Sequence, residues 1–247
     1  MRRIAVCLSK GGVGKTTTAV HLSHGLALRG KRVLLVDCDT QAQAGVLLGT
    51  KASKGLAEVL DGMIQATDAI MEARPNLFLL SGGRKLAESK RRIAQKEIAS
   101  ERVLAEAITP IESRFDYVIM DSSPGWDSLT VNELFYANDV ICPVSLEFLA
   151  VDGLAIFLEA VSGIQKYKPL VIKHIVPTFD DRRVKKSAEI KAQLNKHFSK
   201  RVTGSIRYSV RLSEAAGFGK TIFEHNPTDR AAEDYSALVE EVTLVKA

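Results

Sequence analysis

The chain has 247 residues, of which 46% are hydrophobic and 26% charged, as expected for a globular protein large enough to form a substantial core. No apolar run approaches the roughly 18 residues of a membrane span, and the chain opens on a short strand-like run rather than a signal peptide. Its cysteines, Cys7, Cys38 and Cys142, lack the close spacing of a metal or redox pair. We therefore expect a cytoplasmic protein with buried, reduced thiols.

The net charge of +5 is unevenly distributed along the chain. Residues 182–211 contain ten basic residues and one acid, Glu189, for a local net charge of +9, so the rest of the chain sums to −4. Such asymmetry is typical of a surface that binds a polyanion such as nucleic acid, and equally of a basic helix that is only solvated. The basic residues are Arg182, Arg183, Lys185, Lys186, Lys191, Lys196, Lys200, Arg201, Arg207 and Arg211.

In chain order, short β-branched or apolar runs alternate with longer amphipathic ones. The predicted strands are 4–8, 33–37, 77–80, 117–121, 140–144, 171–176 and, more weakly, 203–206. Helices are expected at 15–29, with Gly30 as C-cap, and at 103–111, 154–167, 188–198 and 231–245. This order predicts an α/β fold, a doubly wound and mostly parallel sheet with helices on both faces. No linker or repeat interrupts it, so we expect a single domain over residues 1–247.

The segment 9–17, with the sequence SKGGVGKTT, joins the first predicted strand to the first predicted helix, where a phosphate-binding loop belongs. Glycines let backbone amides turn toward phosphates, and the helix N-terminus adds the positive end of its dipole. Lys15 would neutralise the terminal phosphates, and the Thr16 hydroxyl would reach Mg²⁺. The pattern predicts a P-loop ATPase with ATP and Mg²⁺ as cofactors. Its expected ATP-binding residues here are Gly11, Gly12, Val13, Gly14, Lys15, Thr16 and Thr17.

Three aspartates follow predicted strands whose C-terminal ends meet this loop in a doubly wound sheet. Asp37 ends the second strand and Asp39 follows it, and capping of the next helix is their alternative role. Asp121 ends the buried run 115–121, which has the form of a Walker B segment, and should hold Mg²⁺ through water. The small, turn-forming segment SSPGW at 122–126 then lies where a switch that senses the γ-phosphate would be.

The loop departs from the strict Walker A pattern, because serine stands at position 9 and Lys10 follows it. It thereby resembles the deviant Walker A ATPases, most closely the ParA/Soj family of partition and cargo-positioning ATPases, whose loop is KGGxGKT. The resemblance implies that Lys10 reaches across an ATP-bound homodimer to the partner subunit's phosphates. It further implies that Asp39 orients or activates the attacking water. Lys10, Lys15 and Asp39 are thus the expected catalytic residues.

The same resemblance assigns the other nucleotide and metal residues. Thr16, Asp39 and Asp121 would hold the metal, partly through water, while Asp37 supports the loop and the metal region. Thr40 replaces the proline of the family's DxDPQ segment, and 122–125 departs from its DCPPS segment. The aspartates remain in place, and the effect of these departures on the switches is left open.

The resemblance continues through the C-terminal third, in PTFDDRR at 177–183, SVRLSEA at 209–215 and GKTI at 219–222. It implies that Pro177 lies on the adenine side of the bound nucleotide. It also implies nonspecific binding of double-stranded DNA through phosphate contacts, with steep salt dependence. The residues expected to bind DNA are Arg183, Lys186, Arg207 and Arg211.

The family implies a cycle in which ATP closes a dimer, the dimer binds DNA, and a ParB-like or other adaptor stimulates slow hydrolysis. Because the chain starts at the first strand, we expect no N-terminal helix-turn-helix domain. Its last predicted helix is acidic, which argues against a membrane-surface anchor and for a cytoplasmic, nucleoid-associated protein.

Three alternatives remain open at this point. A MinD-like membrane-associated positioning ATPase shares the same ATP motifs, and a metabolic P-loop enzyme would add a substrate pocket. An electron-transfer ATPase like the nitrogenase iron protein would need cysteines on loops at a dimer interface, whereas Cys7, Cys38 and Cys142 lie in apolar, strand-like runs. The sequence names neither the cargo nor the adaptor.

Overall fold

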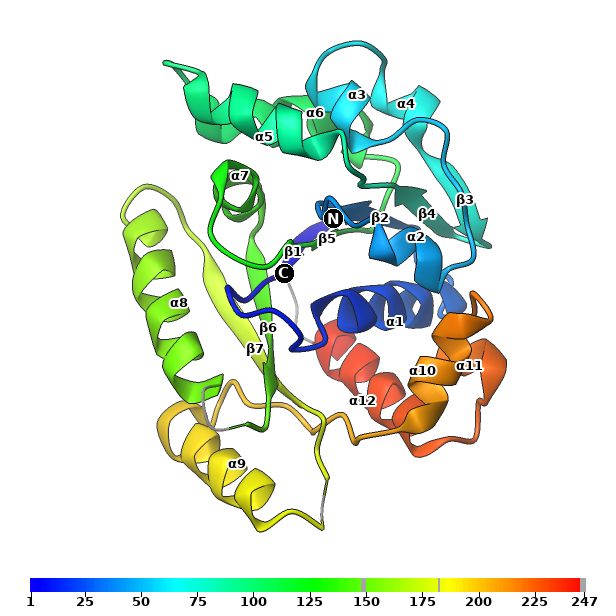
Figure 1. Ribbon diagram of the computed structural model, residues 1–247, viewed down its shortest axis with the longest axis vertical. Coiled ribbons are helices and arrows are strands. Elements are labelled where there is room, and N and C mark those ends of the chain that lie inside the picture. Colours follow the sequence, from blue (N-terminus) through cyan, green and yellow to red (C-terminus); the bar gives the residue numbers. More distant parts are fainter. Residues whose placement is uncertain (148–149, 182, 245–247) are drawn as a thin grey trace.

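Seven strands form a sheet that crosses the molecule (Figure 1). The computed structural model describes residues 1–147, 150–181 and 183–244. The strands are β1 Arg2–Val6, β2 Val33–Asp37, β3 Met71–Arg74, β4 Leu77–Leu80, β5 Tyr117–Asp121, β6 Asp139–Ser145 and β7 Val171–Thr178. Their order in the sheet is β3-β4-β2-β5-β1-β6-β7. In the described part of the chain every neighbouring pair is parallel except β3 with β4 at one edge.

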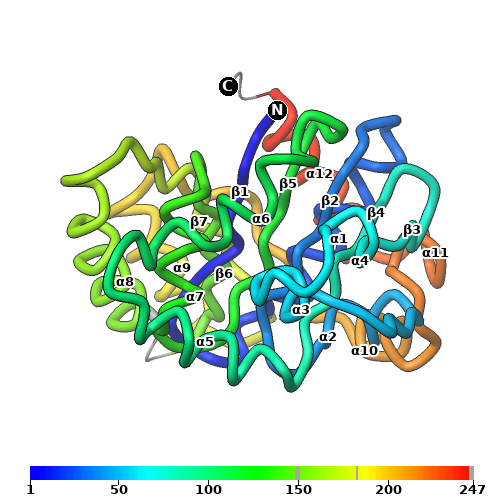
Figure 2. Tube along the Cα trace, turned by 90° about the horizontal axis from the view of Figure 1, so that it is seen from above, coloured from blue at the N-terminus to red at the C-terminus, as the bar shows by residue number. Residues whose placement is uncertain are grey.

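Helices cover both faces of this sheet (Figures 1 and 2). They are α1 Lys15–Leu28, α2 Gln43–Leu47, α3 Leu56–Leu60, α4 Ala66–Ala69, α5 Leu86–Gln95, a 3₁₀ turn Ser100–Arg102, α6 Val103–Glu112, α7 Ser128–Tyr136, α8 Ala150–Gln165, α9 Lys185–Phe198, α10 Val210–Gly217, α11 Ile222–His225 and α12 Arg230–Leu244. The expected doubly wound α/β architecture is confirmed. Within the described ranges, no helix is long and apolar enough to cross a bilayer.

Successive residues of the central strands are buried on opposite sides of the sheet. In β1, Ile4 and Val6 belong to the core that lies against α1 and α12, whereas Ala5 belongs to the core beneath α5, α6, α7 and α8. Because both faces are covered, β2 and β5 are apolar until their last residue. The polar residues that end β2 and β5 are therefore confined to one edge of the sheet, where Asp37 is directly opposite Asp121.

Helix α1 begins and ends at glycines in the left-handed region. Gly14, with φ 87°, is its N-cap, and Gly30, with φ 75°, follows the C-cap residue Arg29. The amides of Gly30 and Lys31 donate to the last carbonyls of the helix. The predicted stop at Gly30 is thus correct within one residue, and the glycine at position 14 orients the first turn.

Several expected elements differ from the structure. The first strand, predicted at 4–8, is Arg2–Val6, and the helices predicted to begin at 154 and 188 begin at Ala150 and Lys185. The strand predicted at 203–206 is wrong, because the chain there makes only isolated parallel bridges beside β7, at Val202 and Arg207. The Thr203 hydroxyl donates to the carbonyl of Gly204, and this local bond competes with a regular ladder. The last predicted helix begins one residue earlier than expected, at Arg230, and Val245 lies outside the described residues.

The core beneath α7 contains a fully buried acid, Glu133. Its Oε2 accepts a hydrogen bond from the Ser122 hydroxyl, the residue that follows β5. In the described chain Oε1 has no partner of hydrogen-bond geometry, although the Cys38 thiol lies nearby. Burial raises the Glu133 pKa to about 7, and the Asp127 carboxylate adds to the effect.

We expect the replacement Glu133→Gln to stabilise the protein increasingly as pH rises. A carboxyl with a raised folded-state pKa stabilises the fold below its unfolded pKa, and this contribution is lost as pH rises toward the folded value. The unfolding free energy of the variant relative to wild type should grow by up to about 3 kcal/mol between about pH 5 and about pH 8. Urea unfolding at both pH values measures it, with the exposed Glu240→Gln as control. A pH-independent difference would contradict the raised pKa.

Candidate nucleotide site

The loop between β1 and α1 has the backbone of a phosphate cradle. Gly12 and Gly14 have φ of 72° and 87°, which L-residues with side chains rarely adopt. No side chain caps the start of α1, so its first amides point out of the helix end. A Cβ at Gly14 would also lie 3.7 Å from Thr178 Cγ2 at the end of β7. The arrangement presents several backbone donors and a helix N-terminus to one small volume.

Lys15 lies inside this loop. Its side chain is buried, with 6% of the residue exposed, and Nζ donates to the Lys10 carbonyl at 2.8 Å. Burial lowers the Lys15 pKa, and the nearby acids Asp121 and Asp39 partly oppose that effect. The amine is therefore held within the backbone of the loop rather than in solvent.

Asp121, at the end of β5, is fully buried, and both carboxylate oxygens lack a hydrogen-bond partner in the described chain. Burial raises its pKa well above the ordinary range, and the opposite Asp37 adds to the rise, whereas the nearby Thr16 hydroxyl lowers it. Two unsatisfied oxygens beside a threonine hydroxyl fit a magnesium ion. No group of three or more His, Cys, Asp or Glu side chains in the described residues could hold a metal, so phosphate or water oxygens would complete the shell.

The two aspartates after β2 have different surroundings. Asp37 is fully buried, and its two oxygens accept hydrogen bonds from the Asp39 and Ala44 amides at 3.0 and 3.1 Å. Burial raises its pKa to about 7. Asp39 is half-buried, and its Oδ1 accepts from the Gln41 amide and the Thr40 hydroxyl. Asp37 thus shapes the turn, while Asp39 lies closer to solvent.

Gly82, which sequence reasoning did not single out, lies against this turn. A Cβ there would lie 2.3 Å from the Asp39 carbonyl oxygen and 2.8 Å from Asp37 Oδ1. The next amide, of Gly83, donates to the same Asp39 carbonyl at 3.0 Å. The only sequence signal was a Gly-Gly pair shortly after a predicted strand.

The segment after β5, residues 122–127, is tied to its surroundings at several points. The Gly125 amide donates to the carbonyl of Ser9 in the phosphate loop at 2.8 Å. Lys90 of α5 donates to Ser123 Oγ at 2.8 Å and to Asp127 Oδ2 at 2.7 Å. Asp127 in turn caps α7. We define residues 122–127 as the switch segment, and Lys90 as a contact that the sequence did not predict.

Lys10 is directed away from the cradle that holds Lys15. Its Nζ lies 3.4 Å from Glu147 Oε2, in an ion pair whose side chains are 27% and 69% exposed. A Cβ at Gly153 in α8 would lie 3.9 Å from Lys10 Cβ, so the lysine stands between the loop and that helix. The two lysines of the loop therefore occupy separate positions.

A small, largely apolar pocket of about 170 Å³ opens beside the start of α1. Thr178 and Phe179 line one side, and residues of the 206–209 segment and α10 line the other. Pro177 is not among the lining residues; it lies in β7, and its carbonyl accepts the Ile206 amide at 2.8 Å. The pocket has the size and the location for part of a nucleoside.

The residues predicted to bind DNA are not equivalent. Arg183 is 84% exposed and pairs with Asp181, and Arg211 is 55% exposed and pairs with Glu214. Lys186 is exposed near the start of α9. Arg207 is only 21% exposed and binds Asp234 and Glu233 of α12. Its guanidinium is committed to holding the 206–209 segment on α12.

Comparison with known proteins agrees with this geometry. A family model described as "AAA domain" matches residues 1–173. The chromosome-partitioning ATPase Soj of Thermus thermophilus is 37% identical over 98% of this chain and 95% of that protein. The chromosome partitioning protein ParA of Caulobacter vibrioides is 33% identical over 98% of this chain and 94% of that protein.

A solved structure shares the whole fold. Cobyrinic acid a,c-diamide synthase from Mycobacterium smegmatis, with bound ATP analog and magnesium, superposes with a TM-score of 0.85 at 28% identity, over 98% of this chain and 94% of that one. The two partition proteins are closer in sequence, and their similarity includes the segments on both sides of the phosphate loop. The chain therefore belongs to the ParA/Soj family of chromosome-partitioning ATPases.

Proposed function

We propose that this protein is an ATPase that dimerises on binding ATP and Mg²⁺, binds DNA nonspecifically in that state, and positions or segregates a cargo with an adaptor that stimulates slow hydrolysis. The observation that carries the proposal is the site at the end of β5, where the Asp121 carboxylate lacks a hydrogen-bond partner among the described residues and lies near Thr16 and Lys15. The buried Lys15 amine, the loop amides and the Asp121 carboxylate together suit a nucleotide with bound magnesium. The proposed location is the cytoplasm, on the nucleoid.

The side chains divide the work of hydrolysis. Lys15 and the loop amides bind the phosphates, while Thr16 and Asp121 hold the metal, which supplies charge stabilisation when bound. Asp39, held by its turn near solvent, orients the attacking water and accepts its proton. Lys10 supplies a second positive charge to the partner subunit's phosphates. Its weak pairing with the exposed Glu147 leaves it able to move.

DNA binding is assigned to the surface formed by α9 and the start of α10. Lys186 and the exposed Arg183 and Arg211 lie on or beside these helices. Phosphate contacts from such side chains carry no sequence information, which fits nonspecific binding. Arg207 is given a structural role instead, because four hydrogen bonds join its guanidinium to the carboxylates of Asp234 and Glu233.

The electron-transfer alternative is disfavoured because Cys7, Cys38 and Cys142 are buried. Other features bear on the membrane-associated and the metabolic alternatives. A membrane-associated ATPase would need an available amphipathic helix, yet α12 buries its apolar residues against α1. The metabolic alternative has a structural neighbour whose title names cobyrinic acid a,c-diamide synthase. That relative is less similar in sequence than Soj, so we rank the alternative second.

Binding to a nonspecific DNA duplex with ATP, with ADP and without nucleotide tests the proposal directly. We expect binding only with ATP and Mg²⁺, and a loss of at least roughly tenfold in affinity between about 50 and about 200 mM salt, because several phosphate contacts are made. Fluorescence anisotropy of labelled DNA measures it, with chelation of magnesium as control. Absence of binding in every state would contradict the DNA step and favour the metabolic alternative.

The substitution Lys10→Ala should abolish ATP-dependent dimerisation and lower the hydrolysis rate by roughly tenfold or more, because a charge supplied by the partner subunit is lost. Binding of ATP to the monomer should persist, since Lys15 is unchanged. Light scattering and phosphate release measure the two effects, with the exposed Lys51→Ala as matched control. An unchanged dimer and rate would exclude the role across the dimer.

Arg211→Glu should weaken DNA binding without changing stability, whereas Arg207→Ala should lower stability. Reversal of the exposed Arg211 should weaken DNA binding roughly tenfold at low salt and leave thermal stability unchanged. Loss of the Arg207 guanidinium should instead destabilise the fold by roughly 1–3 kcal/mol, because the Asp234 carboxylate keeps only the backbone amide of residue 207 as a donor. DNA affinity and urea unfolding of both variants measure this. Full DNA affinity of Arg211→Glu would show that the DNA surface lies elsewhere.

A further inference from the structure

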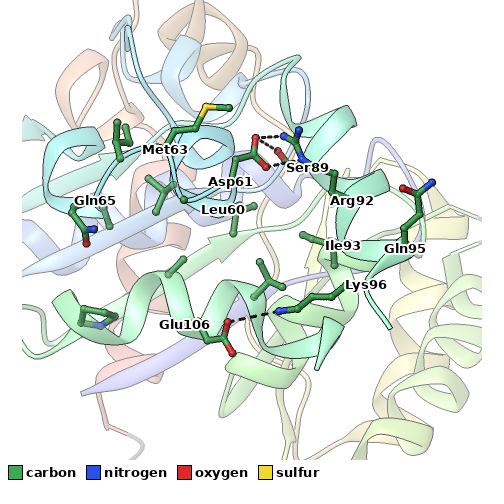
Figure 3. A pocket seen from close by; sticks show the side chains of 17 residues that line it. Leu60, Asp61, Met63, Gln65, Ser89, Arg92, Ile93, Gln95, Lys96 and Glu106 are labelled. Atoms are coloured by element: carbon green, nitrogen blue, oxygen red, sulfur yellow. Dashed lines mark hydrogen bonds and ion pairs between the residues drawn. The ribbon is translucent and has the colours of Figure 1, made fainter. Parts of the chain in front are cut away.

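A cavity of about 730 Å³ lies between α3, α5 and α6, away from the nucleotide site (Figure 3). Its charged side chains are paired with one another, Arg92 with Asp61 and Lys96 with Glu106. Because two bases balance two acids within the lining, the cavity favours neither an acidic nor a basic ligand.

Helix α2, in contrast, has contacts that lead from the nucleotide site to α10, beside which it lies (Figure 2). It begins shortly after the turn that carries Asp39. The Asp37 carboxylate accepts the Ala44 amide, in the first turn of α2, at 3.1 Å. The Asp39 carbonyl accepts the Ala42 amide at 3.2 Å. A displacement of the Asp37–Asp39 turn therefore displaces the start of α2.

The residue that precedes α2 has a strained backbone. Ala42 has a φ of 51°, in the left-handed region that residues with a side chain seldom adopt. Such a conformation persists only where the surrounding contacts impose it. Here the Asp39 turn supplies one of these contacts, so α2 can change its position at little cost when the turn changes.

Arg74, the last residue of β3, joins the ends of α2 and α10. Its Nη1 donates to the carbonyl of Leu48, directly after α2, at 3.1 Å. Its Nη2 donates to the carbonyl of Gly219, just beyond α10, at 3.0 Å. The guanidinium also pairs with Glu224 of α11 at 2.5 Å, and the side chain is only 19% exposed. One planar group is thus bonded to both helix ends.

The backbones of the two turns are also in contact. Gly49 and Gly219 both have a φ of 63°. A Cβ on Gly219 would lie 2.5 Å from the Gly49 Cα, and a Cβ on Gly49 would lie 3.0 Å from the Gly219 carbonyl oxygen. Because no side chain separates the two turns, the end of α2 cannot move toward α10 without displacing it.

Arg211 lies at the opposite end of α10 from these contacts. The helix has 8 residues and is therefore about 12 Å long. Its Leu212 and Ala216 line the pocket beside the phosphate loop, as does Leu47 of α2. A shift of α10 at its C-terminal end therefore moves Arg211 relative to the basic residues of α9.

We propose that α2 and α10 move as one unit joined by Arg74, and that this unit transmits the state of the Asp37–Asp39 turn to the DNA surface at the start of α10. The proposal rests on the proposed function and specifies how the γ-phosphate changes DNA affinity within one chain. The γ-phosphate alters the contacts of the turn, α2 shifts with the turn, and Arg74 moves α10. Arg74 is a positioning residue, because it acts through α10.

Hydrogen exchange of α10 tests the unit without DNA. Mg-ADP and a non-hydrolysable analogue of Mg-ATP carry the same nucleoside, so a difference between them in the exchange of residues 210–219 comes from the γ-phosphate. The measurement is made at concentrations at which light scattering shows a monomer. Wild type should show the difference, as should the control Arg29→Met, which removes an arginine bonded to the Ser236 carbonyl of α12.

The difference should be absent in Arg74→Met and in Arg74→Lys. Lysine keeps a positive charge beside Glu224, so the fold is disturbed less, but an ammonium group cannot span two carbonyls as the guanidinium does. A full difference in either folded variant, or none in wild type, would overturn the unit. Exchange of residues 9–17 reports nucleotide binding in the same samples. A loop that neither nucleotide protects counts against the proposed function.

DNA affinity tests the consequence of the unit. With ATP, Arg74→Lys should dimerise as wild type does, yet bind a nonspecific duplex at least roughly fivefold more weakly, the lower end of usual coupling between sites. Without nucleotide, the two proteins should bind DNA equally. Anisotropy and light scattering measure the two properties. Full DNA affinity of the variant, or a loss that only follows a loss of dimer, would contradict the unit, whereas a wild type that ignores DNA with ATP counts against the proposed function.

Discussion

A carboxylate buried at the end of a central strand, without a hydrogen-bond partner in the described chain, is the constraint on which the nucleotide site depends. Burying such a group costs several kcal/mol unless it is protonated or neutralised, and burial accordingly raises the Asp121 pKa. Compensation must come from cations, and Lys15 is held nearby within the loop. The strand, the loop and the first turn of α1 have to meet at this point, and the parallel order of β2, β5 and β1 brings them together.

The parts of this arrangement that are local in sequence could be predicted. The phosphate loop and the three aspartates lie at or just after the ends of apolar strands, and a strand buried on both faces is recognisable from its composition alone. The helix follows the loop directly. The same holds for Gly30, because helices commonly stop at a left-handed residue and glycine adopts that conformation without strain. An apolar strand and a left-handed glycine are each defined by a few consecutive residues. They can therefore be recognised in the sequence without knowledge of distant contacts.

The parts that depend on distant partners could not be predicted. Arg207 lies in a basic segment and was therefore expected to contact DNA. The structure pairs it with Asp234 of α12 instead. Lys90 is one of several basic residues in α5, and only the packing of that helix on α7 selects it for the switch segment. Gly82 is required by the Asp37 turn, which comes from another strand. In each case the residue type is ordinary, and tertiary structure supplies its role.

The switch segment is hydrogen-bonded to three separate parts of the structure. Its Gly125 amide is bonded to the phosphate loop, and Ser122 is bonded to the buried Glu133. Its other end is held by Lys90 from α5. A segment with bonds to the nucleotide loop, to the core and to a surface helix cannot respond to one without altering its contacts with the others. A ligand of one site that prefers one conformation of the segment therefore changes the affinity of another site for its own ligand. That second ligand changes the affinity of the first site by the same factor.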